Sequence, residues 1–257
     1  MGAFYVPLDD ATFRSTEHTA GPWSAESQHL GPPSALLVRA LERLAPRAET
    51  VLSRVVFEVL GPVPVAELAV TAAVLRPGRS VELLGAELAH EGRPVLRAQA
   101  WRISRGDTSS IATDPAPALT PPAACEPMEL PDAWRCGYLA AMQWRSVSGG
   151  IFVPGDASVW GRPLVPVVDG EEATALQRLF TVADSASGVS SRLDITKWFA
   201  INTDLVVHLH RQPEGEWFAL DARTTLGPDG IGVADSVLHD RLGPVGRTAQ
   251  SLFVRER

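Results

Sequence analysis

The chain shows the same order of expected elements twice, and this repeat constrains its fold more than any other feature. In each half, a segment with apolar residues at helical spacing precedes about four strand-like runs. A shift of 150 residues superimposes 93–99 on 243–249, and the identities pair Pro94 with Pro244, Val95 with Val245 and Arg97 with Arg247. We therefore expect a duplicated α+β unit, in which a long helix is wrapped by an antiparallel sheet.

The boundaries of these elements follow from turn residues and periodicity. The first helix is expected after 29–34, where Pro32 and Pro33 suit a helix entrance. The second is expected over 171–191, with Glu171 and Glu172 at its N-terminus, which favours acidic side chains. The expected strands are 51–60, 66–76, 80–90 and 94–103 in the first half, and 199–211, 216–225, 231–241 and 244–255 in the second.

Residues 106–134 differ from both halves because they are rich in Pro, Ala, Ser and Thr. A stretch of this length and composition is typical of a connection between two units. The predicted organisation is an N-terminal unit at 1–105, a linker at 106–134 and a C-terminal unit at 135–257.

Composition excludes several classes of protein. The 257 residues carry a net charge of −7, so no basic face typical of a nucleic-acid or membrane-surface binder is expected. The sequence contains no run of 18 apolar residues, so no membrane span is predicted. Residues 1–10 have no signal-peptide pattern, and we therefore expect a cytoplasmic protein. Cys125 and Cys136 lack a zinc-binding spacing, and neither a metal nor a cofactor is predicted.

The differences between the two halves point to a site in the second. At the same shift Asp204 lies over Arg54 and Gln250 lies over Ala100, while Thr225 falls near Leu75. An acid, an amide and a hydroxyl therefore occur in one copy only. Each also has a structural explanation: Asp204 as a turn residue before a strand, Gln250 and Thr225 as polar residues on strands.

Such a set of side chains is suited to activating water. A carboxylate can take a proton from water as the water attacks, while amide and hydroxyl groups fix its orientation. A helix N-terminus directed at a substrate carbonyl could stabilise the oxyanion. This chemistry requires no nucleophilic serine.

Both halves resemble the acyl-CoA thioesterase II family, which has a double hotdog fold. The second half carries the resemblance through Asp204 at a strand start, His210-Arg211, Pro213 and Glu216-Trp217, then Thr225, Gly232 and Gln250. The first half carries it through 21–42, which includes the sequence HLGPP. The family has His-Gly-Gly-Pro-Pro here, whereas this chain has Leu30 in place of one glycine.

The resemblance implies hydrolysis of acyl thioesters by a water held by Asp204, Thr225 and Gln250, with Thr224 replacing Thr225 if the strand register slips by one. It also implies that His29 and Gly31 bind substrate. The expected substrate is an acyl-CoA or an acyl carrier protein thioester. Because antiparallel sheets leave faces and edges to cover, we also expect a homo-oligomer.

A metal hydrolase is disfavoured: His208 and His210 share one strand face, with His239 and Asp240 downstream, but no third ligand follows at a firm spacing and Arg211 is adjacent. Two alternatives remain. A hotdog hydratase or dehydratase would need an acid paired with a histidine near the helix, for which Asp184 or Asp204 with His29 could serve. A non-catalytic acyl-CoA or lipid-binding protein would keep the fold and bind thioesters without releasing thiol.

Overall fold

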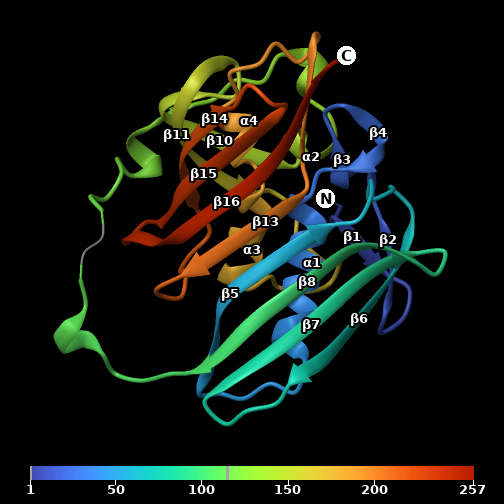
Figure 1. Ribbon diagram of the computed structural model, residues 1–257, viewed down its shortest axis with the longest axis vertical. Helices are drawn as coiled ribbons and strands as arrows, with labels where there is room; N and C mark the ends of the chain where they lie inside the picture. The colour runs from blue at the N-terminus through green and yellow to red at the C-terminus, as the bar shows by residue number, and fades with distance from the viewer. Residues whose placement is uncertain (1, 114–115) are drawn as a thin grey trace.

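The computed structural model describes residues 2–113 and 116–257, and an antiparallel sheet runs through both halves (Figure 1). The strands of the first half are β1 (Tyr5–Pro7), β2 (Thr12–Ser15), β3 (Ala20–Gly21), β4 (Ser24–Gln28), β5 (Thr50–Val59), β6 (Glu67–Arg76), β7 (Val81–His90) and β8 (Arg93–Ser104). Those of the second half are β9 (Glu126–Pro127), β10 (Met142–Gly150), β11 (Val153–Pro163), β12 (Trp198–Asn202), β13 (Asp204–Leu209), β14 (Phe218–Leu226), β15 (Ile231–Asp240) and β16 (Gly243–Glu256).

The α-helices lie inside the curve of this sheet (Figure 1). They are α1 (Gly31–Arg43), α2 (Gly137–Ala140), α3 (Ala175–Ala183) and α4 (Ala186–Val189). Four short 3-10 turns complete the regular structure of the described residues: η1 (Glu17–Thr19), η2 (Ser109–Ile111), η3 (Pro122–Ala124) and η4 (Asp132–Trp134). Among these residues, no helix is both long enough and apolar enough to span a bilayer.

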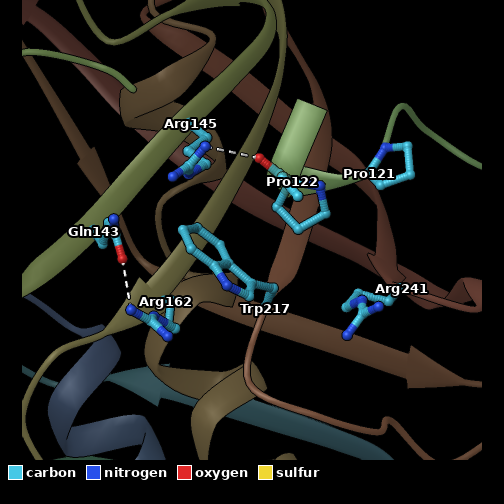
Figure 2. Close-up of a pocket in the computed structure, with 8 residues that line it drawn as sticks. Pro121, Pro122, Gln143, Arg145, Arg162, Trp217 and Arg241 are labelled. Carbon is cyan, nitrogen blue, oxygen red and sulfur yellow. Dashed lines mark hydrogen bonds between the residues drawn. The ribbon is translucent and has the colours of Figure 1, made fainter. Parts of the chain in front are cut away.

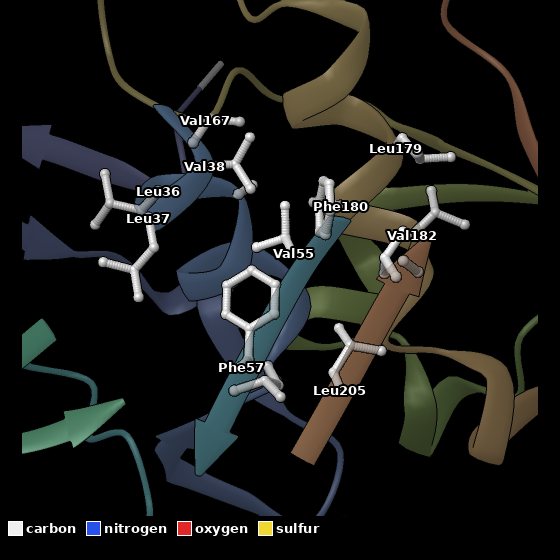
Figure 3. Packing of buried hydrophobic residues seen from close by; sticks show 14 of the residues in the cluster. Leu36, Leu37, Val38, Val55, Phe57, Val167, Leu179, Phe180, Val182 and Leu205 are labelled. Carbon is white, nitrogen blue, oxygen red and sulfur yellow. The ribbon is translucent and has the colours of Figure 1, made fainter. Parts of the chain in front are cut away.

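The two halves meet where β5 pairs with β13. The sheet order is β1–β2–β6–β7–β8–β5–β13–β16–β15–β14–β11–β10–β9, with β12 also paired to β16. Phe57 of β5 lies opposite Leu205 of β13, and both point into a core that includes Phe180 of α3 (Figure 3). The Phe57 and Phe180 ring centroids are 5.6 Å apart. Burial of these large side chains from both halves makes the two units one packed body.

The repeat expected from the sequence is confirmed in the strands. β7 and β15 begin 150 residues apart, at Val81 and Ile231, and β8 and β16 begin at Arg93 and Gly243. The irregularities of the two hairpins also correspond. The register shifts at Leu88/Ala89 in the first hairpin and at Leu238/His239 in the second. Each unit thus has its own helix wrapped by an antiparallel sheet, as the double hotdog prediction requires.

The central helices approach closely at one point. A Cβ atom on Gly31 would lie 2.2 Å from the backbone oxygen of Thr181 in α3. The same Thr181 oxygen accepts a hydrogen bond of 2.9 Å from the Tyr138 hydroxyl. Gly31 is therefore required where the entrance of α1 meets α3, because only glycine leaves room for the backbone.

Two expected elements are interrupted. The helix expected over 171–191 separates into α3 and α4 around Asp184 and Ser185, and α3 begins after Thr174, whose hydroxyl accepts from Gln177 N. Glu171 does not cap that helix, so this part of the prediction was wrong. Its carboxylate is held by Arg39 and Arg43 of α1 instead. The strand expected over 199–211 separates into β12 and β13.

The expected linker has structure of its own over part of its length. β9 pairs with β10, and the Thr120 backbone oxygen accepts from Trp160 Nε1 at 2.8 Å. Cys125 packs against Trp160 and Ala219 on the outer face of the second sheet. Residues 114 and 115 of the expected linker lie outside the described residues.

Candidate active site

Asp184 lies in the break between α3 and α4, and its carboxyl group is the centre of a buried polar cluster. The residue is 6% exposed. Its Oδ1 accepts hydrogen bonds from Asn202 Nδ2 at 2.9 Å and from Gln250 Nε2 at 2.8 Å. Its Oδ2 lies 3.2 Å from His29 Nδ1. The carboxyl group thus joins the second unit's helix to its sheet and to the entrance of α1.

Asn202 reaches the carboxyl group because β12 and β13 are separated by a bulge against β16. The pairing runs from Asn202 with Leu252 to Val206 with Ala249, so residues 203–205 face only 250–251. An extra residue bends a strand and changes the direction of its side chains. At this bulge, the Asp204 carboxylate accepts from Ser251 N at 2.7 Å and replaces a missing ladder acceptor.

Gln250 connects both sides of the helix break. Besides the Asp184 carboxyl group, its Nε2 reaches the Asp184 backbone oxygen at 3.1 Å, and its Oε1 accepts from Ser187 N at 3.2 Å. The side chain is almost fully buried, at 1% exposed. It therefore fixes the position of the carboxyl group relative to α4.

His29, just before α1, is held on one ring face and at its Nδ1 atom. Its ring stacks on Tyr138 with centroids 3.8 Å apart and planes 10° apart. Its Nδ1 accepts from Gly31 N at 3.1 Å. A ring nitrogen that accepts this hydrogen bond carries no proton, so it can only accept from Asp184 as well. Of the two groups, only Asp184 can then donate a proton to this contact, from a protonated Oδ2.

Electrostatics favour the same protonation state. Desolvation by burial raises the pKa of Asp184 to about 8, although hydrogen bonds from Asn202, the Leu30 backbone and Gln250 oppose this increase. Desolvation also lowers the pKa of His29 to about 3. An uncharged acid beside an uncharged imidazole avoids two buried charges. Asp184 is thus a carboxyl group that titrates near neutral pH, where a general base is most effective.

Comparisons with known protein families agree with this architecture in both halves. The acyl-CoA thioesterase N-terminal domain matches residues 19–103, and the acyl-CoA thioesterase C-terminal domain matches residues 122–254. The chain belongs to the acyl-CoA thioesterase family. It is therefore a thioester hydrolase of the double hotdog type, as the resemblance in the sequence predicted.

Solved structures share the fold over nearly the whole thioesterase chain. A hot dog fold protein of unknown function from Alicyclobacillus acidocaldarius has a TM-score of 0.76 at 17% identity, covering 98% of this chain and 95% of that one. An acyl-CoA thioesterase II from Mycobacterium marinum has a TM-score of 0.68 at 15% identity, with coverage of 98% and 95%. No curated protein is similar enough to count as a match.

The thioesterase brings together only some of the side chains expected from its sequence. Gln250 and His29 lie in the cluster around Asp184, and Gly31 lies beside it at the contact of α1 with α3. Asp204 is directed to Ser251 instead, and Thr225 is exposed opposite Val233. Their assignment as catalytic residues stays a prediction that this geometry does not support.

The alternative hydroxyl, Thr224, points inward from the same strand. It is 4% exposed, and its Oγ1 lies 2.7 Å from Ser190 Oγ at the end of α4. Its hydroxyl therefore supports the short helix that follows the break. Alternation along β14 explains why Thr224 and Thr225 face opposite sides of the sheet.

The entrance of α1 does not offer free donors to a substrate oxyanion. The Leu30 N–H forms a hydrogen bond with the Asp184 carboxyl group that lowers its pKa. The Gly31 N–H donates to His29 Nδ1. Pro32 and Pro33 have no N–H. The first donors of α1 serve the Asp184 cluster, so this helix end does not supply the oxyanion site that the sequence led us to expect at a helix N-terminus, which stays a prediction.

The histidines and the acid that were weighed as metal ligands do not converge. Asp240 forms a bidentate ion pair with Arg211, and His210 Nε2 lies 3.1 Å from the Pro244 backbone oxygen. Over residues 2–113 and 116–257, no three His, Cys, Asp or Glu side chains gather as metal ligands.

Sequence reasoning gave Asp184 only as part of a hydratase alternative and missed Asn202. A signal for Asp184 was present, because an acid follows the apolar stripe of the second helix directly and so enters the core. Asn202 carried no comparable signal, since its inward direction depends on the bulge.

Proposed function

We propose that this protein hydrolyses acyl-CoA thioesters with a water activated by Asp184, in a site completed by Asn202, Gln250 and His29. The observation that carries the proposal is the buried Asp184 carboxyl group, with two amide donors on Oδ1 and an imidazole beside Oδ2. Gln250 keeps the role expected from the sequence. Asp184 takes the role expected of Asp204, and Asn202 that of Thr225.

The proposed reaction needs one base and no covalent intermediate. The ionised Asp184 carboxylate takes a proton from water while the water oxygen bonds to the thioester carbon. The carbon–sulfur bond then breaks, and the proton passes from Asp184 to the departing thiolate. The products are a carboxylic acid and a thiol, so atoms and charge balance.

The amides support this step by orientation. Asn202 and Gln250 each donate to the same carboxylate oxygen, which fixes the plane of the carboxylate. A fixed base needs less reorganisation to reach the transition state than a mobile one. Tyr138 holds His29 by stacking, and His29 in turn stabilises the resting protonated form of Asp184.

The test is thiol release from a panel of acyl-CoAs with short, long, branched and aromatic acyl groups. The proposal expects release by the wild-type protein, with the preferred acyl group defining the substrate class. It also expects Asp184→Asn to lose about 100-fold or more of kcat. Failure to release thiol from every member of the panel would contradict it. Parallel assays with acyl carrier protein thioesters identify the thiol carrier.

A hydratase or dehydratase is the second candidate, because one observation favours it. That chemistry uses an acid with a histidine, and Asp184 lies 3.2 Å from His29. Incubation with a 2-enoyl-CoA separates the two functions. Hydration without thiol release would favour the second candidate, and thiol release without a hydroxyacyl product would exclude it. The homo-oligomer expected from the sequence stays a prediction.

A further inference from the structure

A cavity of about 360 Å³ opens on the outer face of the second sheet, away from the proposed active site. Two strand neighbours on the inner face establish this orientation. Trp144 packs against Tyr138, and a Cβ atom on Gly161 would lie 3.2 Å from Val182 of α3. Because successive side chains alternate between faces, Gln143, Arg145 and Arg162 point outward.

The cavity is lined by three guanidinium groups around one indole (Figure 2). They come from Arg145 of β10, Arg162 of β11 and Arg241 of the β15–β16 turn. The guanidinium carbons of Arg145 and Arg162 lie 5.7 Å and 5.1 Å from the centre of the Trp217 ring. Stacking against an aromatic face holds a guanidinium in a fixed plane and leaves its edge available for a ligand.

The positive charge of this cavity is only partly compensated. Arg162 Nη1 lies 3.3 Å from Glu216 Oε2, and its Nη2 donates to Gln143 Oε1. Within the described residues, neither Arg145 nor Arg241 forms an ion pair. Two uncompensated cations therefore face one cavity, although the chain as a whole carries a net charge of −7.

The arginine side chains of this cavity are also held in place, and some of their hydrogen-bond donors have no acceptor. Arg145 Nη1 donates to the backbone oxygens of Pro122 and Cys125, which fixes the segment that forms the cavity wall. The Nε atoms of Arg145 and Arg162 are buried without a hydrogen-bond acceptor. Unsatisfied buried donors of this kind are uncommon in folded proteins.

We propose that this cavity binds the phosphate group of a small phosphate-bearing ligand. A phosphate monoester carries a charge of about −1.5 to −2 near neutral pH, which matches the two uncompensated guanidinium groups. Arginine side chains recognise phosphate through paired hydrogen bonds. The ligand is either the nucleotide end of a coenzyme A thioester or a separate phosphorylated metabolite, and both present the same group. The sheet lies between this cavity and Asp184, so the bound phosphate is not at the reacting carbonyl.

Arg241→Gln is the sharpest test variant, because Arg241 makes no side-chain hydrogen bond or ion pair with the residues that the structure describes, so its loss should not disturb the fold. Arg93→Gln, at the first residue of β8 in the other unit, is the matched control. Calorimetric titration with inorganic phosphate, pyrophosphate and adenosine 3′,5′-bisphosphate measures binding without any turnover. We expect saturable binding of at least one probe by the wild type, weakened about tenfold or more in Arg241→Gln and unchanged in Arg93→Gln.

Absence of saturable binding for all three probes, or equal binding by Arg241→Gln and wild type, would overturn the proposal. The two sources of the phosphate are separated by kinetics. A KM raised by Arg241→Gln for acyl-CoA, but not for the matching acyl-pantetheine, assigns the site to the coenzyme. Weaker phosphate binding with both KM values unchanged assigns it to a separate metabolite. Because the binding arm needs no catalysis, its outcome is independent of the proposed hydrolysis.

Discussion

The Gln250 side-chain amide donates to the Asp184 carboxyl group at 2.8 Å, and this contact connects the last strand to the break between α3 and α4. Gln250 therefore does more than fill a strand position. It stabilises the ionised carboxylate and fixes its orientation, together with Asn202 on the neighbouring strand.

Removing one of these amides is expected to change the pH dependence of catalysis. Both hydrogen bonds lower the pKa of Asp184 against the effect of burial. In Asn202→Ala the carboxylate loses a donor, so its pKa rises and the ascending limb of kcat/KM moves to higher pH. The maximal rate also falls, because the carboxylate plane is less constrained. An unshifted profile in this variant would mean that Asn202 does not act on the titrating group.

The wild-type protein itself should show an ascending pH profile. The base must be ionised to accept a proton, and burial raises the pKa of Asp184 to about 8. We expect kcat/KM to rise about tenfold per pH unit below that value and to level off above it. A profile that is flat from pH 5 to 9, on a substrate whose chemical step limits the rate, would contradict the assignment of Asp184 as base.

Stability should depend on pH through the same group. The folded-state pKa of Asp184 lies above the ordinary value of about 3.9, so the folded state keeps a proton that the unfolded state releases. Its contribution is complete below about pH 4 and is lost as pH rises toward 8, where the loss is on the order of a few kcal/mol. Asp184→Asn removes this titration and retains the hydrogen-bonding pattern of the acid.

Urea denaturation of wild type and Asp184→Asn at several pH values measures this difference. The difference in the free energy of unfolding, variant minus wild type, should increase as pH rises from 5 to 8. A constant difference across this range would show that Asp184 has no raised pKa.

Gly31 should be essential for packing. Its φ angle is ordinary, but a Cβ atom would lie 2.2 Å from the Thr181 backbone oxygen. Gly31→Ala must separate α1 from α3, so we expect a loss of about 1–3 kcal/mol in the free energy of unfolding. Gly106→Ala is the control, because its Cβ atom would meet nothing within 4 Å. Equal stability of the two variants would mean that the helices adjust without strain.

The strands and the repeat were predictable from the sequence because they depend on local alternation and on turns. The ends of β7 and β8 fall within a residue of their expected positions, and the shift of 150 recurs in β15 and β16. The hairpin of β10 and β11 was not expected. Its sequence includes glycines at 149, 150, 155 and 161, which weaken the strand pattern.

The candidate site was less predictable because it depends on two interruptions. The helix break places Asp184 in the core, and the bulge at 203–205 turns Asn202 toward it while Asp204 pairs with Ser251. Both interruptions contact β16, through Gln250 at the helix break and Ser251 at the bulge. A sequence comparison of the halves finds Gln250, which lies on a regular strand, but cannot find partners whose direction is set by irregular backbone.

Paired isosteric variants test the central claim most directly. Thiol release should be measured for wild type, Asp184→Asn and Asp204→Asn on the best acyl-CoA of the panel. Asparagine at 204 can still accept from Ser251 N, so this variant should fold and retain activity close to that of the wild type. Asp184→Asn should also fold but lose about 100-fold or more of kcat. The opposite result, an active Asp184→Asn and an inactive Asp204→Asn, would contradict the account and return the catalytic role to Asp204.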